Sequence, residues 1–172
     1  ISFPSALALG IEALDEIVEL EIVGEFSLQE IEANVRRELP AGMDLIELCP
    51  LLAGIGKAKV IGASYRVELP TAVCASVAQR IESLKQQSMI EVDRDGKTVT
   101  CDPNDPQFEL RLEEEFLDFT LPNTAAGSLR PLEMLTILGL PDLLSDGANL
   151  QRTRVHLSEK STVPATEQSR TT

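Results

Sequence analysis

Tryptophan is absent from this sequence of 172 residues, and aromatic residues make up only 3% of it. Histidine occurs once, as His156, and the three cysteines lie far apart, at Cys49, Cys74 and Cys101. Zinc and iron–sulfur sites need closely spaced cysteine or histidine ligands, so the sequence predicts no such site. An odd number of scattered thiols also argues against a secreted disulfide framework and favours the reducing cytoplasm.

Basic residues are scarce too, because 15 Lys and Arg stand against 28 Asp and Glu, which gives a formal net charge of -13. A protein that binds phosphate backbones by itself needs clustered bases, so direct DNA binding is not expected. No apolar run approaches the ~20 residues of a membrane span, and no membrane contact is expected. Hydrophobic residues nevertheless make up 43% of the chain, which is enough for a packed core.

Acidic residues are concentrated in two stretches. Residues 1–35 carry eight acids and no Lys or Arg, and residues 101–122 carry seven acids against Arg111. Such runs are usually solvated faces of strands or helices. The carboxylates of Glu113–Glu115 and Asp118 could bind a divalent cation, but three consecutive carboxylates point in different directions. A solvated turn is therefore the favoured interpretation, and no metal site is predicted there.

Residues 1–50 predict an incomplete α+β unit. The first eleven residues have the character of an irregular edge strand, and the period-two alternation of Glu16–Val23 predicts a half-buried strand. Ser27 and Glu30 then have the spacing of a capping box, which predicts a helix start. Met43–Cys49 predicts another strand. Residues 51–63 are rich in glycine and are interpreted as a linker, and the P-loop-like Gly54–Lys57 within them lacks two positions of that motif.

Residues 64–157 predict a complete β-α-β-β-α-β unit with an additional hairpin. Hydrophobic periodicity, turn residues and caps place its strands, helices and hairpins at Tyr65–Leu69, Pro70–Leu84, Met89–Cys101 around Asp95-Gly96, Phe108–Leu121, Pro131–Gly139 and Leu150–Leu157. The predicted fold is thus α+β, with two tandem ferredoxin-like modules of which the first lacks its opening strand and helix. Residues 158–172 have little apolar content and predict a disordered tail.

Two side chains outside the acidic stretches could carry chemistry. His156 titrates near neutrality, but no local motif supplies a serine or cysteine partner, so catalysis is disfavoured. Arg130 directly precedes the predicted helix start at Pro131, where backbone N–H groups and a guanidinium could bind an anion. The alternative for Arg130 is an ion pair with a nearby acidic strand.

Six segments match a known pattern: Ile1–Phe3, Leu7–Glu12, Glu16–Glu21, Ala63–Val67, Ser128–Leu135 and Arg152–Thr153. In their order and spacing they resemble the radical SAM-linked protein family, a domain of unknown function encoded beside, or fused to the C-terminal end of, a radical SAM protein. The resemblance covers nearly all of residues 1–157. Family members carry a further strand, a Ser-His-Leu-Asp segment, a basic helix and a Gly-Phe-x-Pro-x-Pro stretch ahead of the position of Ile1. The chain therefore resembles a family member truncated at its N-terminus.

The resemblance implies an accessory or substrate-recognition domain that works with a radical SAM enzyme in RNA modification or processing. The partner domain would hold an iron–sulfur cluster and S-adenosylmethionine, whereas this chain lacks the C-x-x-x-C-x-x-C motif and is expected to bind no cofactor and to be no enzyme by itself. RNA is expected as a partner through the segment ahead of Ile1. The candidate substrate- or anion-binding residues are Ser2, Glu12, Arg130 and Arg152.

Two alternatives come from other functional classes. The acidic strands could instead form a protein–protein interaction module that docks a basic surface of a radical SAM or ribosome-linked partner. An independent hydrolase that uses the carboxylates between Glu113 and Asp118 is the least favoured of the three.

Overall fold

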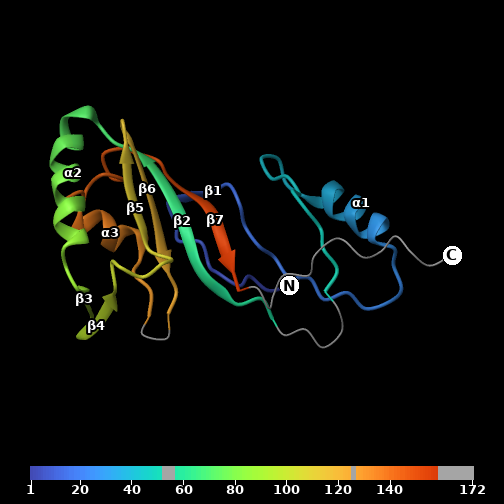
Figure 1. Cartoon of the computed structure of the whole chain (residues 1–172). Helices are drawn as coiled ribbons and strands as arrows, with labels where there is room; N and C mark the ends of the chain where they lie inside the picture. The colour runs from blue at the N-terminus through green and yellow to red at the C-terminus, as the bar shows by residue number, and fades with distance from the viewer. Residues whose placement is uncertain (52–56, 125–126, 159–172) are drawn as a thin grey trace.

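The computed structural model describes residues 1–51, 57–124 and 127–158. Its architecture is α+β, as the sequence predicts, and the elements follow one another along the chain in the order shown in Figure 1. They are β1 (Ile11–Ala13), α1 (Leu28–Glu38), β2 (Val60–Glu68), α2 (Thr71–Lys85), β3 (Ile90–Arg94), β4 (Lys97–Cys101), β5 (Glu109–Glu113), β6 (Phe116–Pro122), α3 (Pro131–Ile137) and β7 (Leu150–Leu157). Over the described ranges, no helix is long and apolar enough to cross a membrane.

Five strands form one sheet in the order β1-β7-β2-β6-β5, and β3 and β4 form a separate hairpin. β1 is parallel to β7, while the pairs β7–β2, β2–β6 and β6–β5 are antiparallel. Along the chain, β2-α2-β5-β6-α3-β7 has the β-α-β-β-α-β order predicted for residues 64–157, with the β3–β4 hairpin inserted after α2. β7, the last strand among the described residues, therefore lies inside the sheet.

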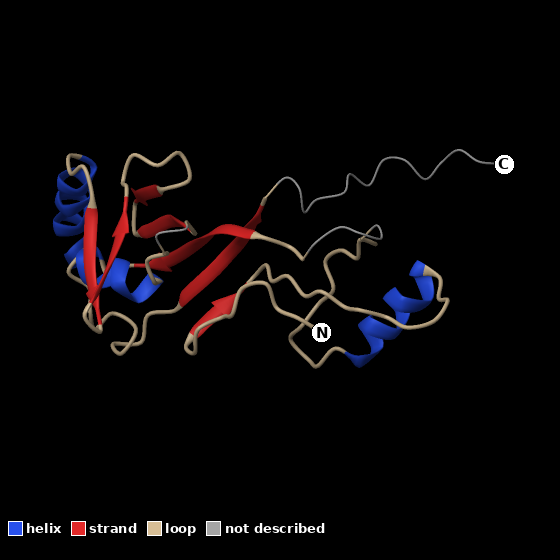
Figure 2. Ribbon diagram, turned by 90° about the horizontal axis from the view of Figure 1, so that it is seen from below, coloured by secondary structure: helices blue, strands red, loops and turns tan. Residues whose placement is uncertain are grey.

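The hydrophobic core lies between one face of this sheet and the helices α2 and α3, which sit together on that face (Figures 1 and 2). Phe119 and Leu117 of β6 and Leu150 of β7 are at most 1% exposed, as are Met134 and Leu135 of α3. Burial of each such side chain stabilises the fold by roughly 1.5–3 kcal/mol. Among the described residues, all buried apolar side chains except Ile11 come from residues 60–155.

Local sequence signals account for the element boundaries. At the start of α1, Ser27 Oγ accepts from the Glu30 backbone N–H at 3.2 Å and the Ser27 N–H donates to Glu30 Oε2 at 2.9 Å, which is the predicted capping box. Asp95 and Gly96 have φ angles of +53° and +77°, the sign pattern of the two-residue turn that Asp-Gly favours. These two signals are sufficient to place α1 and the β3–β4 hairpin.

Residues 1–51 differ from the prediction. Neither Glu16–Val23 nor Met43–Cys49 forms a strand, apart from one isolated bridge between Ser2 and Glu19. The segment contributes only β1 to the sheet, where it pairs with β7, and α1, which has no buried residue and lies apart from α2 and α3 (Figures 1 and 2). A strand needs a neighbour along its length for its backbone hydrogen bonds, and in the described chain neither segment has one beyond the single Ser2–Glu19 bridge.

β2 begins at Val60, inside the stretch of residues 51–63 predicted to be a linker. Gly62 is a sheet residue, and a Cβ there would lie only 2.9 Å from the carbonyl oxygen of Leu121 on β6. Its role is to allow the close approach of the neighbouring strand rather than to supply flexibility. Residues 52–56 of the P-loop-like stretch and residues 159–172 of the predicted tail lie outside the described residues.

Candidate functional site

The second face of the sheet is polar and carries no helix among the described elements. Strand alternation produces it: Tyr65 and Val67 of β2 point into the core, so Ser64, Arg66 and Glu68 point to the opposite side. The same alternation on β6 turns Phe116, Asp118 and Thr120 outward, and on β5 it does so for Glu109, Arg111 and Glu113. We call this surface the open sheet face.

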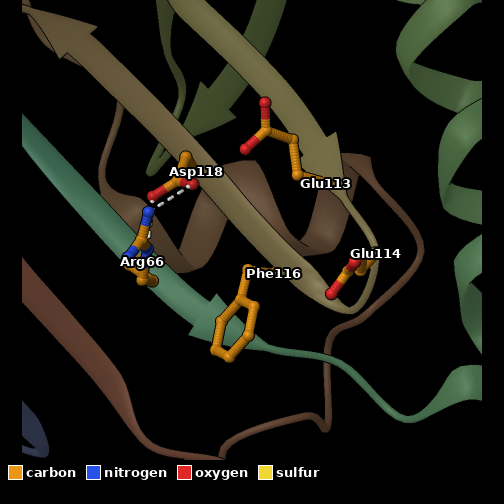
Figure 3. A pocket seen from close by; sticks show the side chains of 5 residues that line it. All are labelled: Arg66, Glu113, Glu114, Phe116 and Asp118. Atoms are coloured by element: carbon orange, nitrogen blue, oxygen red, sulfur yellow. Dashed lines mark hydrogen bonds and ion pairs between the residues drawn. The ribbon is translucent and has the colours of Figure 1, made fainter.

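One end of the open sheet face holds a pocket of about 560 Å³, which we call the Arg66 pocket (Figure 3). Its lining side chains come from β2, β5, β6 and the β5–β6 turn, and they are Arg66, Glu113, Glu114, Phe116 and Asp118. The Arg66 guanidinium donates to both carboxylate oxygens of Asp118, with Nε–Oδ1 at 2.7 Å and Nη2–Oδ2 at 2.9 Å. The same guanidinium lies 5.6 Å from the centre of the Phe116 ring. Arg66 is therefore fixed by two neighbours on β6.

Carboxylates surround Phe116. In the strand registers, Glu68 of β2 and Glu113 of β5 are its two cross-strand neighbours, and Glu114 follows in the turn. Within the described chain Glu113 pairs with Arg111 at 3.2 Å, while Glu114 has no hydrogen bond or ion pair. Among the lining residues, the carboxylates of Glu113, Glu114 and Asp118 stand against the single guanidinium of Arg66, which gives the pocket a formal net charge of about -2.

A chain of side-chain hydrogen bonds lies next to the Arg66 pocket on the same face. Ser64 Oγ is 2.7 Å from His156 Nε2 and 2.8 Å from Thr120 Oγ1, so the chain joins β7, β2 and β6. Burial, with a smaller contribution from Arg154, lowers the pKa of His156 below its usual value. Its imidazole is therefore neutral at pH 7, and Nε2 can either donate to Ser64 or accept from it.

The Ser64–His156 pair has the hydrogen bond of a nucleophile and its base, but the described chain lacks the remaining parts of a catalytic site. No residue there binds His156 Nδ1 to orient the ring, and neither Ser64 nor His156 lines the Arg66 pocket. We therefore assign the Ser64–His156–Thr120 chain to the cohesion of three strands.

Arg152, a candidate binding residue, is buried in the interior with a relative exposure of 2%. Its guanidinium forms a two-point ion pair with Glu16, at 2.5 Å for both contacts, and donates to the hydroxyl of Ser5 at 3.1 Å. It also donates to the backbone carbonyls of Ser5 and Ala6. All of these partners belong to the N-terminal segment, so Arg152 attaches that segment to β7.

Ser2 and Glu12, two further candidates, also make contacts within the fold. Ser2 Oγ donates to Glu19 Oε2 at 2.9 Å, and Glu19 Oε1 accepts from the Ala58 N–H at 2.5 Å. The Ala58 N–H first, and then Ser2, hold the pKa of Glu19 below its usual value. Glu12 accepts from Gln151 across the β1–β7 pair at 3.1 Å.

Arg130, the fourth candidate, is exposed at the first turn of α3. Its backbone N–H donates to Glu133 Oε2 at 2.7 Å, and Glu133 in turn binds the guanidinium of Arg94 at 2.6 and 2.8 Å. The nearby ion pair is thus made by Arg94. In the described chain the Arg130 guanidinium makes no hydrogen bond or ion pair, although its charge contributes, after Arg94 and the Arg130 N–H, to lowering the pKa of Glu133. Glu12 and Arg152 lie on adjacent strands but on opposite faces, and the four candidates do not form one cluster.

Among the described residues, no group of three or more His, Cys, Asp or Glu side chains could hold a metal ion. The side chains of the three consecutive glutamates point in different directions, as is usual in a turn. Glu113 and Glu114 line the Arg66 pocket, whereas Glu115 binds the hydroxyl of Thr71 at the start of α2.

Sequence reasoning missed Arg66, Phe116 and Ser64 as site residues, and it weighed Asp118 only as one of four carboxylates that could bind a cation. Each of their side-chain hydrogen bonds and ring contacts joins residues of two strands that are at least 50 positions apart in sequence. The available signal was the alternation itself, since a polar residue at every second position of a strand otherwise rich in apolar residues marks a solvent-facing row.

A family model described as "Uncharacterized protein conserved in bacteria (DUF2344)" matches residues 1–131. No curated protein and no solved structure matches the chain. The matched range includes β1 to β6 and every residue of the Arg66 pocket.

Proposed function

The chain belongs to the bacterial family of uncharacterized proteins designated DUF2344, and we propose that it is an accessory domain that docks onto a radical SAM enzyme. The observation that carries the docking is the placement of exposed apolar side chains. Of the seventeen large apolar side chains exposed in the described chain, fourteen lie in residues 1–51. We call these fourteen the N-terminal apolar surface.

Exposure of the N-terminal apolar surface to water is unfavourable in free energy for an isolated domain. Val23 is 92% exposed, Ile46 is 72% exposed, and α1 adds exposed Leu28 without burying any residue. Scattered exposed apolar residues are normal, but a concentration of this kind in one third of a chain marks an interaction site. A partner protein that covers it would recover roughly 25 cal/mol for each Å² of apolar surface removed from water.

The charge of the same segment defines the partner. Residues 1–35 carry eight acids and no Lys or Arg, so a basic rim around an apolar groove is complementary to them. The resemblance to the radical SAM-linked family supports an enzyme of that class as the partner, and a cytoplasmic complex. RNA is proposed as the substrate of that complex, bound by the partner, because a chain of net charge -13 is unsuited to hold a phosphate backbone alone.

We also propose how the chain is divided into modules. We interpret residues 1–50 as part of a first ferredoxin-like module and residues 60–157 as the second. The second has the β-α-β-β-α-β element order, while the first has one capped helix and apolar side chains that no described element covers. In the complex, the partner covers these side chains.

Co-purification tests the docking. The chain is co-expressed with the proposed partner, a radical SAM protein of the same organism, and Val23→Asp with Ile46→Asp is compared with the wild type. Both positions are solvent-exposed, so the double variant should fold normally but should lose the partner. Met89→Asp, at an exposed apolar position outside residues 1–51, is the control and should retain the partner. Equal recovery of the partner by all three proteins would overturn the proposal.

A charge reversal tests the acidic part separately. Glu21 and Glu25 are exposed, whereas Glu19 binds Ser2 and Ala58 within the fold and is unsuited to the test. Glu21→Lys with Glu25→Lys should weaken partner recovery at low salt, and the difference from wild type should shrink as salt screens the charges.

A further inference from the structure

We propose that the Arg66 pocket binds a basic side chain, an arginine guanidinium or a lysine ammonium, presented by an extended segment of a partner protein. This inference rests on the proposed function in that the chain docks a protein. It concerns a different surface, however, because the pocket is built from β2, β5 and β6 and not from residues 1–51.

The exposed aromatic ring is the first argument. Phe116 is 40% exposed, although the described chain exposes only two other large apolar side chains beyond residue 51. The Arg66 guanidinium already lies over the ring at 5.6 Å and shows that the ring accepts a cation. A second cation can approach the exposed part of the ring, because ring faces attract cations.

The carboxylates are the second argument. Arg66 is satisfied by both oxygens of Asp118, and Arg111 contacts Glu113, so the carboxylate of Glu114 remains without a cation in the described chain. Glu68 lies directly across from Phe116 on β2. An incoming cation would meet the lining carboxylates of Glu114 and Glu113, whereas an anion would meet net repulsion. The pocket therefore selects positive charge.

The volume and position are the third argument. About 560 Å³ exceeds what a single ion needs and suits the end of a long side chain together with its solvent. The pocket opens on a sheet face without a helix, so an extended segment can lie along the strands and insert one side chain. Arginine fits best, since its planar guanidinium can stack on the ring and pair with a carboxylate at the same time.

The test uses the chain alone and three blocked tripeptides, Gly-Arg-Gly, Gly-Lys-Gly and Gly-Gln-Gly, followed by NMR of the backbone amides. The arginine peptide should shift the amides of Glu114 and Phe116 with a dissociation constant of about 1 mM, the scale of a weak single-side-chain contact. The lysine peptide should bind more weakly, and the glutamine peptide should cause no saturable shift.

Three variants locate the site. Glu114→Gln and Phe116→Leu should each weaken binding of the arginine peptide by about threefold, as expected for one exposed ion pair or cation–ring contact. Glu109→Gln removes an equal charge from the same strand face outside the pocket and should leave binding unchanged. Equal shifts with the glutamine peptide, absence of saturation, or equal effects of Glu109→Gln and Glu114→Gln would overturn the inference.

Failure of this test is separate from failure of the proposed docking. The tripeptide experiment needs no partner, and the co-purification experiment changes Val23, Ile46 and the control position Met89, none of which lines the Arg66 pocket. Loss of peptide binding with retained partner recovery would leave the N-terminal apolar surface as the docking site and remove the pocket from it.

Discussion

Arg152 in β7 and Glu16 in the N-terminal segment form a two-point ion pair between residues 136 positions apart in sequence. The arginine is buried and also donates to Ser5 and Ala6, so one side chain holds three points of the segment. Together with the β1–β7 pairing, this contact decides whether residues 1–16 belong to the folded domain.

Removal of one partner should therefore be costly. Glu16→Ala leaves the charge of Arg152 buried without its carboxylate partner. The variant should lower the free energy of unfolding by about 3 kcal/mol. This value is at the lower end of the range for breaking a buried ion pair, because Glu16 is partly solvated. Urea unfolding followed by far-ultraviolet circular dichroism measures it. Glu32→Ala removes an exposed helical pair with Arg36 and should change stability by less than about 0.5 kcal/mol. Similar losses in both variants would contradict the structural role of Arg152.

Hydrogen exchange should divide the chain into two parts. Amides of α1 should exchange rapidly, because the helix buries no side chain and is held only by its caps and exposed side-chain pairs. Amides of β2, β6 and β7 should exchange only on global unfolding, since their neighbours are the most buried in the structure. Protection in α1 equal to that in β6, in a monomeric sample, would show that α1 is packed in solution.

In the β5–β6 turn, Glu114 has a left-handed backbone conformation that is unfavourable for a residue with a side chain, and substitution by glycine should relieve this strain. Glu114 has a φ of +55°, a region that costs a side-chain-bearing residue about 1 kcal/mol or more. Glu114→Gly should therefore raise the free energy of unfolding by roughly 0.5–1 kcal/mol. In the opposite direction, Gly96→Ala at a φ of +77° should lower it by about 1 kcal/mol, although no atom lies near the added Cβ. Thermal unfolding of both variants, compared with the wild type, tests these two expected changes in stability.

Stability should fall with acidification in a window set by His156. Burial lowers its pKa in the folded state, so the unfolded chain binds the proton more readily. The stability that depends on a neutral His156 is therefore fully present above the unfolded-state pKa of about 6.5. It declines as the pH falls from there toward the lower folded-state pKa. His156→Gln should flatten the stability profile between about pH 7.5 and 5.5, because the chain has no other histidine. Parallel profiles for the two proteins would contradict this assignment.

The elements predicted correctly from sequence are those whose determinants are local. The capping box of Ser27 and Glu30, Pro131 at the start of α3 and the Asp95-Gly96 turn each act within four residues. The prediction of a strand over Leu150–Leu157 is also correct, since these bounds coincide with those of β7. In these cases backbone preference and tertiary structure agree, so pattern reasoning is sufficient.

Strand partners could not be predicted, and the errors follow from that. The alternation of Glu16–Val23 is real, but alternation produces a strand only where another edge accepts its hydrogen bonds. Gly62 resembles a linker residue in sequence and is a point of strand contact in the fold. The Arg66–Asp118 contact depends on the register of β2 against β6, which no local pattern specifies.

The interior position of β7 has a consequence for synthesis. Ile11 pairs with Leu150, which the ribosome adds 139 residues later. One edge of β2 likewise stays unpaired until β7 has been synthesised. Such distant pairing slows folding, because the entropy of closing a long loop is lost before any contact compensates it. The growing chain therefore carries an unpaired β2 edge and an unattached N-terminal segment until its last strand emerges, and this is the interval in which chaperone protection matters most.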